Sequence, residues 1–134
     1  MKYYLAFLFV VFTSLVSGQN STNNYFVSDI SNINEIKITS SELNKIAGEY
    51  GQTTVFYQLK VQKVSDHYLL LAKDISQKWI YAFELKNIGS ELYIDVDKHI
   101  NACESEMLSL SIFIIKEGEI DGCVKSDHHV LGRN

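Results

Sequence analysis

From residue 55 onward, apolar and polar residues alternate, and this alternation constrains the fold more than any other feature of the chain. A period of two is typical of a β-strand with one face buried and one face in water. The turns between the alternating segments are short and leave no room for the crossover helices that parallel strands require. We therefore predict an antiparallel sheet. The alternating apolar residues are Val55, Tyr57, Leu59 and Val61, then Trp79, Tyr81, Phe83 and Leu85, then Leu92, Ile94 and Val96, and finally Leu108, Leu110, Ile112 and Ile114.

One short helix is predicted before these strands. Thr39 and Glu42 have the spacing of a capping box, in which two side chains three residues apart each accept a hydrogen bond from a backbone N–H. Apolar residues then recur at helical spacing, and Gly48 or Gly51 would end the helix after about two to three turns.

The predicted fold class is mainly β. About six strands would form an antiparallel up-and-down meander that closes into a barrel or half-barrel, with the short helix at one end. Lys116-Glu117-Gly118 is predicted to turn the last hairpin, because glycine adopts the positive φ of a tight turn. The alternative is an α+β, cystatin-like arrangement in which the helix lies across a curled sheet. The two folds differ in whether the helix or a cavity occupies the interior, and the sequence supports both.

The segment Ile46-Ala47-Gly48-Glu49-Tyr50 resembles the Gly-x-Trp entry of lipocalin-like barrels, with Tyr50 where lipocalins usually carry Trp. The resemblance spans roughly residues 46–124. It implies a barrel whose interior holds a small apolar ligand. The same residues also fit a simpler interpretation, in which a glycine ends the helix and a tyrosine begins a strand.

The first 18 residues have the composition of a secretory signal peptide. Lys2 supplies a positive charge, residues 3–16 are almost all apolar, and Ser17-Gly18 are small residues of the kind found at a cleavage site. The apolar run is shorter than the roughly 17–25 residues of a membrane-spanning helix. We predict cleavage and a secreted or periplasmic protein, and a retained N-terminal anchor is the competing interpretation.

The remaining chain suits one domain. We predict a polar, poorly ordered leader over residues 19–34, a single β-rich domain over 35–126 and a flexible tail over 127–134.

The charge pattern argues against two classes of partner. The chain has 12 Lys and Arg residues against 16 Asp and Glu, and the basic residues are scattered along the sequence. Proteins that follow a nucleic-acid backbone carry a basic patch, which is absent from this sequence. An acidic surface also disfavours anionic membranes. We predict neither nucleic-acid binding nor membrane binding after signal cleavage.

Cys103 and Cys123 are the only cysteines, and they bracket the last predicted hairpin. In an exported protein, two cysteines indicate one disulfide. A redox pair would more typically be spaced as Cys-x-x-Cys. Two other states remain open, namely free thiols and a metal site that also uses histidines.

The histidines that could join such a metal site are His99, four residues before Cys103, and His128 and His129, just after Cys123. A structural zinc site needs four nitrogen or sulfur ligands. The strict spacing of known zinc modules is absent, so we predict no metal and no cofactor. Nucleophile motifs and paired acidic residues typical of hydrolases are also absent, and we predict that the protein is not an enzyme.

Aromatic residues are the remaining candidates for a binding site. Trp79, Tyr81 and Phe83 alternate on one strand, and Tyr57 lies on a facing strand. In a packed domain they would form the core, whereas in a closed barrel they would line the ligand cavity. We predict a small exported binding protein that holds a small apolar molecule in a β-barrel. The alternative is a protein-interaction or inhibitor module with a filled core.

Overall fold

The structure is a computed structural model that describes residues 25–52, 54–76, 78–124 and 127–132. The predicted signal peptide lies outside these residues. Within them, no helix combines the length and the apolar character needed to cross a membrane.

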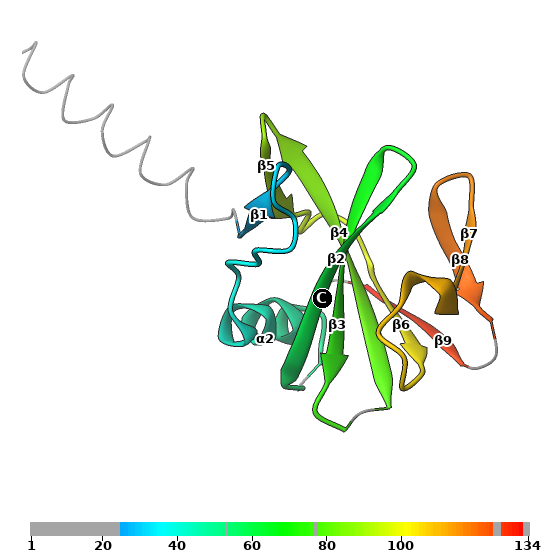
Figure 1. Ribbon diagram of the computed structural model, residues 1–134. Coiled ribbons are helices and arrows are strands. Elements are labelled where there is room, and N and C mark those ends of the chain that lie inside the picture. Colours follow the sequence, from blue (N-terminus) through cyan, green and yellow to red (C-terminus); the bar gives the residue numbers. More distant parts are fainter. Residues whose placement is uncertain (1–24, 53, 77, 125–126, 133–134) are drawn as a thin grey trace, which may run out of the picture.

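Strands dominate the described part of the chain (Figure 1). Seven strands form one antiparallel sheet in the order β1-β5-β4-β3-β2, with β6 paired to β4 and β9 paired to β6. The predicted fold class is confirmed, because the sheet is an antiparallel meander curled into a half-barrel with one α-helix. The elements are β1 (Phe26–Asp29), α2 (Ser40–Glu49), β2 (Phe56–Val64), β3 (His67–Asp74), β4 (Trp79–Ile88), β5 (Glu91–Ile94), β6 (Ile100–Glu104), the 3-10 helix η1 (Leu110–Ile112), β7 (Phe113–Lys116), β8 (Glu119–Cys123) and β9 (His128–Leu131).

Strand β4 organises the sheet because it is long enough to pair with two strands along one edge. Its first half, Trp79–Ala82, pairs with β6, and its second half, Leu85–Ile88, pairs with β5. Strand β9 then extends β6, and β1 extends β5. The sheet is therefore a continuous β2-β3-β4 meander that divides into two arms.

Positive φ angles mark three hairpin turns, among them the predicted turn at Lys116-Glu117-Gly118. Ser65 turns β2 into β3 at φ 52°, and Gly89 turns β4 into β5 at φ 64°. The β7–β8 turn uses Glu117 at φ 54° and Gly118 at φ 80°. Tight hairpins favour this left-handed conformation because its twist matches that of the strands.

Helix α2 has both predicted end signals. The Thr39 hydroxyl accepts from the Glu42 N–H at 3.1 Å, and the Glu42 carboxylate accepts from the Thr39 N–H at 3.2 Å. At the other end Gly51 has φ 84°, and the Gly51 and Gln52 N–H groups donate to carbonyls inside the last turn. This is the Schellman ending that a glycine after a helix favours.

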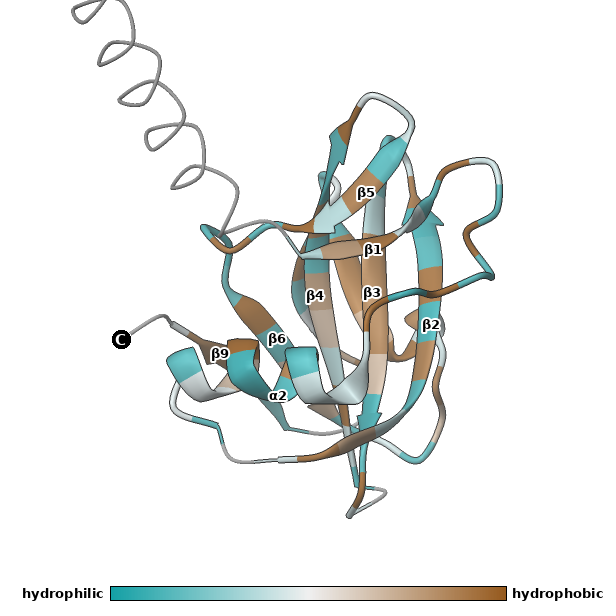
Figure 2. Ribbon diagram, turned by 90° about the vertical axis from the view of Figure 1, so that its left-hand side faces the viewer, coloured by the Kyte–Doolittle hydropathy of each residue, from teal (hydrophilic) through white to brown (hydrophobic). Residues whose placement is uncertain are grey.

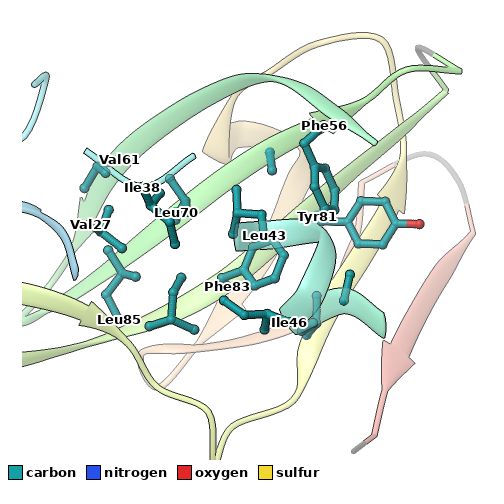
Figure 3. Close-up of a cluster of buried hydrophobic side chains, with 14 of the residues drawn as sticks. Val27, Ile38, Leu43, Ile46, Phe56, Val61, Leu70, Tyr81, Phe83 and Leu85 are labelled. Carbon is teal, nitrogen blue, oxygen red and sulfur yellow. The ribbon is translucent and has the colours of Figure 1, made fainter. Parts of the chain in front are cut away.

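The main core lies between α2 and the inner face of the half-barrel (Figures 2 and 3). The structure thereby decides between the two predicted interiors, because side chains of the helix fill the space that a ligand cavity would need. Leu43, Ile46 and Ala47 of α2 are fully buried against the sheet. The sheet side chains of this core include Phe56, Val61, Leu70, Ala72, Tyr81, Phe83, Leu85, Leu92, Ile94, Ile100 and Ala102.

A second core covers the opposite, outer face of the sheet. The β7–β8 hairpin forms a separate two-stranded sheet and packs with η1 against β3, β4 and β6. This differs from the predicted meander, in which residues 108–115 form one straight strand. The apolar residues of this segment pack against Leu69, Leu71 and Ile80, so both faces of the central strands are buried.

The predicted disulfide between Cys103 and Cys123 is confirmed, with the two Cα atoms 6.0 Å apart. Cys103 lies on β6 and is fully buried, whereas Cys123 ends β8. The bond therefore joins two layers of the protein, the main sheet and the outer hairpin.

A β-bulge between Phe56 and Gln58 changes the predicted faces of β2. Phe56 pairs with Asp74, but Gln58 pairs with Lys73, so one extra residue stands on the β2 side. A bulge of this kind reverses the alternation of side chains. Phe56 is consequently 1% exposed, while Tyr57, which the alternation placed with Val61, is 45% exposed.

Both predicted flexible ends contribute strands. Strand β1 lies within residues 19–34, pairs with β5 and buries Val27 completely. Strand β9 lies within residues 127–134 and pairs with β6. Short polar segments carry a weak strand signal, and these two segments become ordered because a neighbouring strand offers unpaired backbone groups.

Candidate functional site

An open cleft of about 330 Å³ lies where α2 ends beside β4, β6 and β9. Its volume is near the lower end of the roughly 300–1,000 Å³ of small-molecule sites. Three aromatic rings, two aliphatic side chains and one amide line it: Trp79, Tyr81, His129, Ala102, Leu131 and Gln52.

The β3–β4 turn positions Trp79. Asp74 is 5% exposed, and its carboxylate accepts from the Ser76 hydroxyl at 2.8 Å and from the Trp79 backbone N–H at 3.3 Å. A buried carboxylate is costly unless donors surround it, so these contacts stabilise the turn. They also fix the position of Trp79, the first residue of β4, whose ring forms one wall of the cleft.

Strand pairing places the other rings. Tyr81 lies opposite Ala102, and Ala102 lies opposite His129, so the three residues form one row across β4, β6 and β9. Cross-strand neighbours share a face of the sheet. The small Ala102 side chain lies between the rings of Tyr81 and His129. Because it fills little space, the cleft is deep at this point. The His129 ring contacts the Trp79 ring, with centroids 5.2 Å apart and planes inclined by 56°.

The end of α2 supplies the remaining wall. The Schellman turn places Gln52 directly after the helix, at the cleft. Tyr50 holds this end of the helix, since its hydroxyl lies 3.0 Å from the Val96 carbonyl and 2.8 Å from the Lys98 carbonyl. Tyr50 is therefore part of the scaffold, at the position where the lipocalin-like pattern has Trp.

The cleft has no lining side chain with a permanent charge. Among the described residues, the side-chain amide of Gln52 and the Tyr81 hydroxyl make no hydrogen bond, so both remain available to a ligand. Figure 3 shows the Tyr81 ring at the end of the core, with its hydroxyl directed away from Phe83 and Leu85. Burial raises the pKa of Tyr81 above its ordinary value, and the Asp74 carboxylate adds to this effect.

This raised pKa predicts a loss of stability in alkali. A group whose pKa is higher in the folded state contributes stability that is complete below its unfolded pKa, about 10 for tyrosine, and is lost as the pH rises through the folded pKa. Tyr81→Phe should therefore lose less stability than the wild type above pH about 10. Urea unfolding at a series of pH values measures this, with Tyr57→Phe as the control. The same alkaline loss in Tyr81→Phe and wild type would contradict the assignment. The pKa of Tyr93 is also raised and would remain so in both proteins.

Two of the four predicted ligand-lining residues reach this cleft. Trp79 and Tyr81 line it, whereas Phe83 is 1% exposed in the main core and Tyr57 lies on the surface because of the bulge. Sequence reasoning missed Gln52, Ala102 and Leu131, which carry no chemical motif. The strand register that brings them together could not be read from the alternation.

The three histidines of the speculative metal site do not converge. Consecutive residues of a strand point to opposite faces, so His129 faces the cleft and His128 faces away from it. His128 Nε2 lies 3.0 Å from Asn101 Oδ1, and His99 lies beside Gly132. Within the residues that the structure describes, no group of three or more His, Cys, Asp and Glu is arranged to hold a metal ion.

The adjoining hollows around the outer hairpin have a different character. They measure about 400 and 320 Å³, share Glu84, Lys98 and Glu119, and are lined by more acidic than basic side chains. The further acidic residues that line one or the other are Asp66, Asp95, Asp97 and Glu117. The aromatic cleft differs from both hollows, because none of its lining side chains carries a permanent charge.

No family model, curated protein or solved structure matches this chain.

Proposed function

We propose that this chain is a small exported binding protein without enzymatic activity, and that its ligand occupies the cleft lined by Trp79, Tyr81 and His129. The ligand would be a small uncharged molecule with at least one apolar face. One observation carries the proposal, namely an open recess with three aromatic rings and uncommitted polar groups at its wall. Apolar walls with a few polar groups are the usual composition of a ligand site.

The filled interior moves the proposed ligand away from the position that a lipocalin-like barrel implies. Leu43 and Ile46 pack on the inner face of the sheet, where such a ligand would lie. The cleft beside the end of α2 is lined by two of the predicted aromatic residues, Trp79 and Tyr81. The proposal thus retains Trp79 and Tyr81 as ligand-lining residues and does not include Phe83 or Tyr57.

Export is part of the proposal. A disulfide persists in oxidising compartments, and the predicted signal peptide over residues 1–18 agrees with the Cys103–Cys123 bond. The protein would act outside the cytoplasm without binding nucleic acid or a membrane, as its scattered basic residues suggest.

The test uses Trp79, the only tryptophan in the chain. Its single indole N–H resonance in a nitrogen-15-labelled sample reports directly on the cleft. We expect a library of small neutral ring compounds to contain members that shift this resonance together with the Gln52 amide and Ala102 signals. Trp79→Ala should lose those shifts at the remaining residues, and Tyr57→Ala should keep them. If no compound moves these signals, or if the shifts lie elsewhere, the proposal fails.

Docking on another protein is the second candidate function, and exposed apolar residues favour it. Val55, Tyr57 and Ile75 are 45%, 45% and 65% exposed, and the Ile75 N–H donates to the Val55 carbonyl at 2.8 Å, so they are neighbours. Exposed apolar clusters often mark interaction sites. Under this function, Tyr57→Ala would abolish partner binding while Trp79→Ala would leave it unchanged.

A further inference from the structure

We propose that the ligand of the aromatic cleft is an uncharged sugar residue, held by stacking on Trp79 and by hydrogen bonds to the polar groups around it. This inference rests on the proposed function and names the class of its ligand. Sugars combine apolar C–H faces with a rim of hydroxyl groups, and the cleft combines the groups that would meet both.

The charge distribution favours a neutral ligand. Each of the six lining residues lacks a permanent charge, although the chain carries an excess of Asp and Glu over Lys and Arg. An ionic ligand would lose its hydration here without gaining a charged partner, which is unfavourable. An anion would also lie near the Asp74 carboxylate, which already raises the pKa of Tyr81. Sugar acids should therefore bind less well than neutral sugars.

The angle between the rings of Trp79 and His129 favours a ligand that is puckered and not flat. Trp79 and His129 are in contact and inclined by 56°, so they form a corner and leave no parallel slot between them. Ala102 gives this corner its depth, because it separates Tyr81 from His129 in the cross-strand row. A puckered sugar ring can lay one C–H face on Trp79 and turn its edge toward Tyr81.

The polar groups match hydroxyl chemistry. The side-chain amide of Gln52 and the hydroxyl of Tyr81 can each both donate and accept a hydrogen bond, as a sugar hydroxyl does. Neither makes a hydrogen bond within the described residues. A hydrocarbon ligand would bury these groups without partners, and unpaired buried polar groups lower affinity. The pairing of an aromatic face with such groups is what separates a sugar from a purely apolar ligand.

The experiment titrates the wild-type protein with the methyl glycosides of glucose, galactose, mannose and N-acetylglucosamine. Binding is followed by the Trp79 indole N–H resonance and by tryptophan fluorescence. We expect at least one glycoside to bind with a dissociation constant on the order of 1 mM, a typical affinity for a ligand of this size. Glucuronic acid should bind at least about tenfold more weakly, because its negative charge finds no partner in the cleft and lies near the Asp74 carboxylate.

Two conservative variants test the contacts without disturbing the core. Tyr81→Phe removes only a hydroxyl and should weaken glycoside binding about three- to tenfold, the effect of one lost hydrogen bond. Gln52→Ala should act similarly, since Gln52 lies after the helix. Tyr57→Phe removes the hydroxyl of a tyrosine that does not line the cleft and should leave the affinity unchanged.

The outcomes separate the two proposals. If phenol or indole moves the Trp79 resonance and no glycoside does, the cleft binds ligands but the sugar assignment is wrong. If glycosides bind equally to wild type, Tyr81→Phe and Gln52→Ala, the proposed contacts are wrong and the assignment fails. If neither the glycosides nor the wider set of neutral ring compounds moves the resonance, the proposed function fails together with the sugar assignment.

Discussion

Phe56→Ala is expected to lower the free energy of unfolding by about 3–5 kcal/mol, whereas Tyr57→Ala should lower it by less than about 1 kcal/mol. Phe56 is 1% exposed and contacts the rings of Tyr81 and Phe83, at centroid distances of 5.1 and 5.8 Å. Truncation would leave a cavity between α2 and the sheet, and the core packing would relax only partly around it. Tyr57 is nearly half exposed, so its truncation removes little buried surface.

This pair of adjacent aromatic residues also tests the β-bulge. Without the bulge, the alternation of the sequence would bury Tyr57 beside Val61 and expose Phe56, and the two losses would be reversed. Urea unfolding of both variants, followed by circular dichroism, measures the losses. Phe56→Leu is the matched control because it retains most of the apolar volume. Equal losses in the two alanine variants would contradict the register in the structure.

Replacing both cysteines, Cys103→Ala with Cys123→Ala, is expected to cost about 3 kcal/mol. The disulfide closes a segment with a sequence separation of 20 residues, and a loop of that length carries a substantial closure entropy in the unfolded chain. The bond also anchors the β7–β8 hairpin to β6, so we expect its loss to lower the local stability of this hairpin most.

Hydrogen exchange locates this effect. In the double variant, amides of β7 and β8 should lose more protection than amides of β3 and β4, because the hairpin loses its covalent link to β6. Reduced wild-type protein is the control and should behave like the double variant. A variant as stable as the oxidised wild type would show that the bond is energetically unimportant.

Much of the local structure follows from short sequence patterns. The capping box at Thr39 and Glu42, the glycine after α2 and the turns at Ser65, Gly89 and Gly118 each depend on a few neighbouring residues. Local hydrogen bonds and permitted φ angles decide these features, so the residues at those positions are sufficient to predict them.

The predicted ligand site depended on long-range features and was recovered only in part. The alternation correctly placed Trp79, Tyr81 and Phe83 on one face of β4, but Phe83 lies too deep in the core to reach the cleft. Gln52, Ala102 and Leu131 come from three separate segments and meet only through the register of β4, β6 and β9. No pattern within a single segment of the sequence predicts that these three residues lie close together.

The sequence by itself predicted the antiparallel sheet, the start of the helix with its capping box, and a disulfide between the two cysteines, whereas the structure decided that Gly51 and not Gly48 follows the helix. These depend on the period of the apolar residues, on turn chemistry and on the presence of a single cysteine pair. The tertiary structure decided that α2 fills the half-barrel, that the last hairpin covers the outer face, and that Phe56 is buried in place of Tyr57. The physical reason is that apolar residues specify which side chains are buried but do not specify against which partner, and only the competition among all packing surfaces makes that choice.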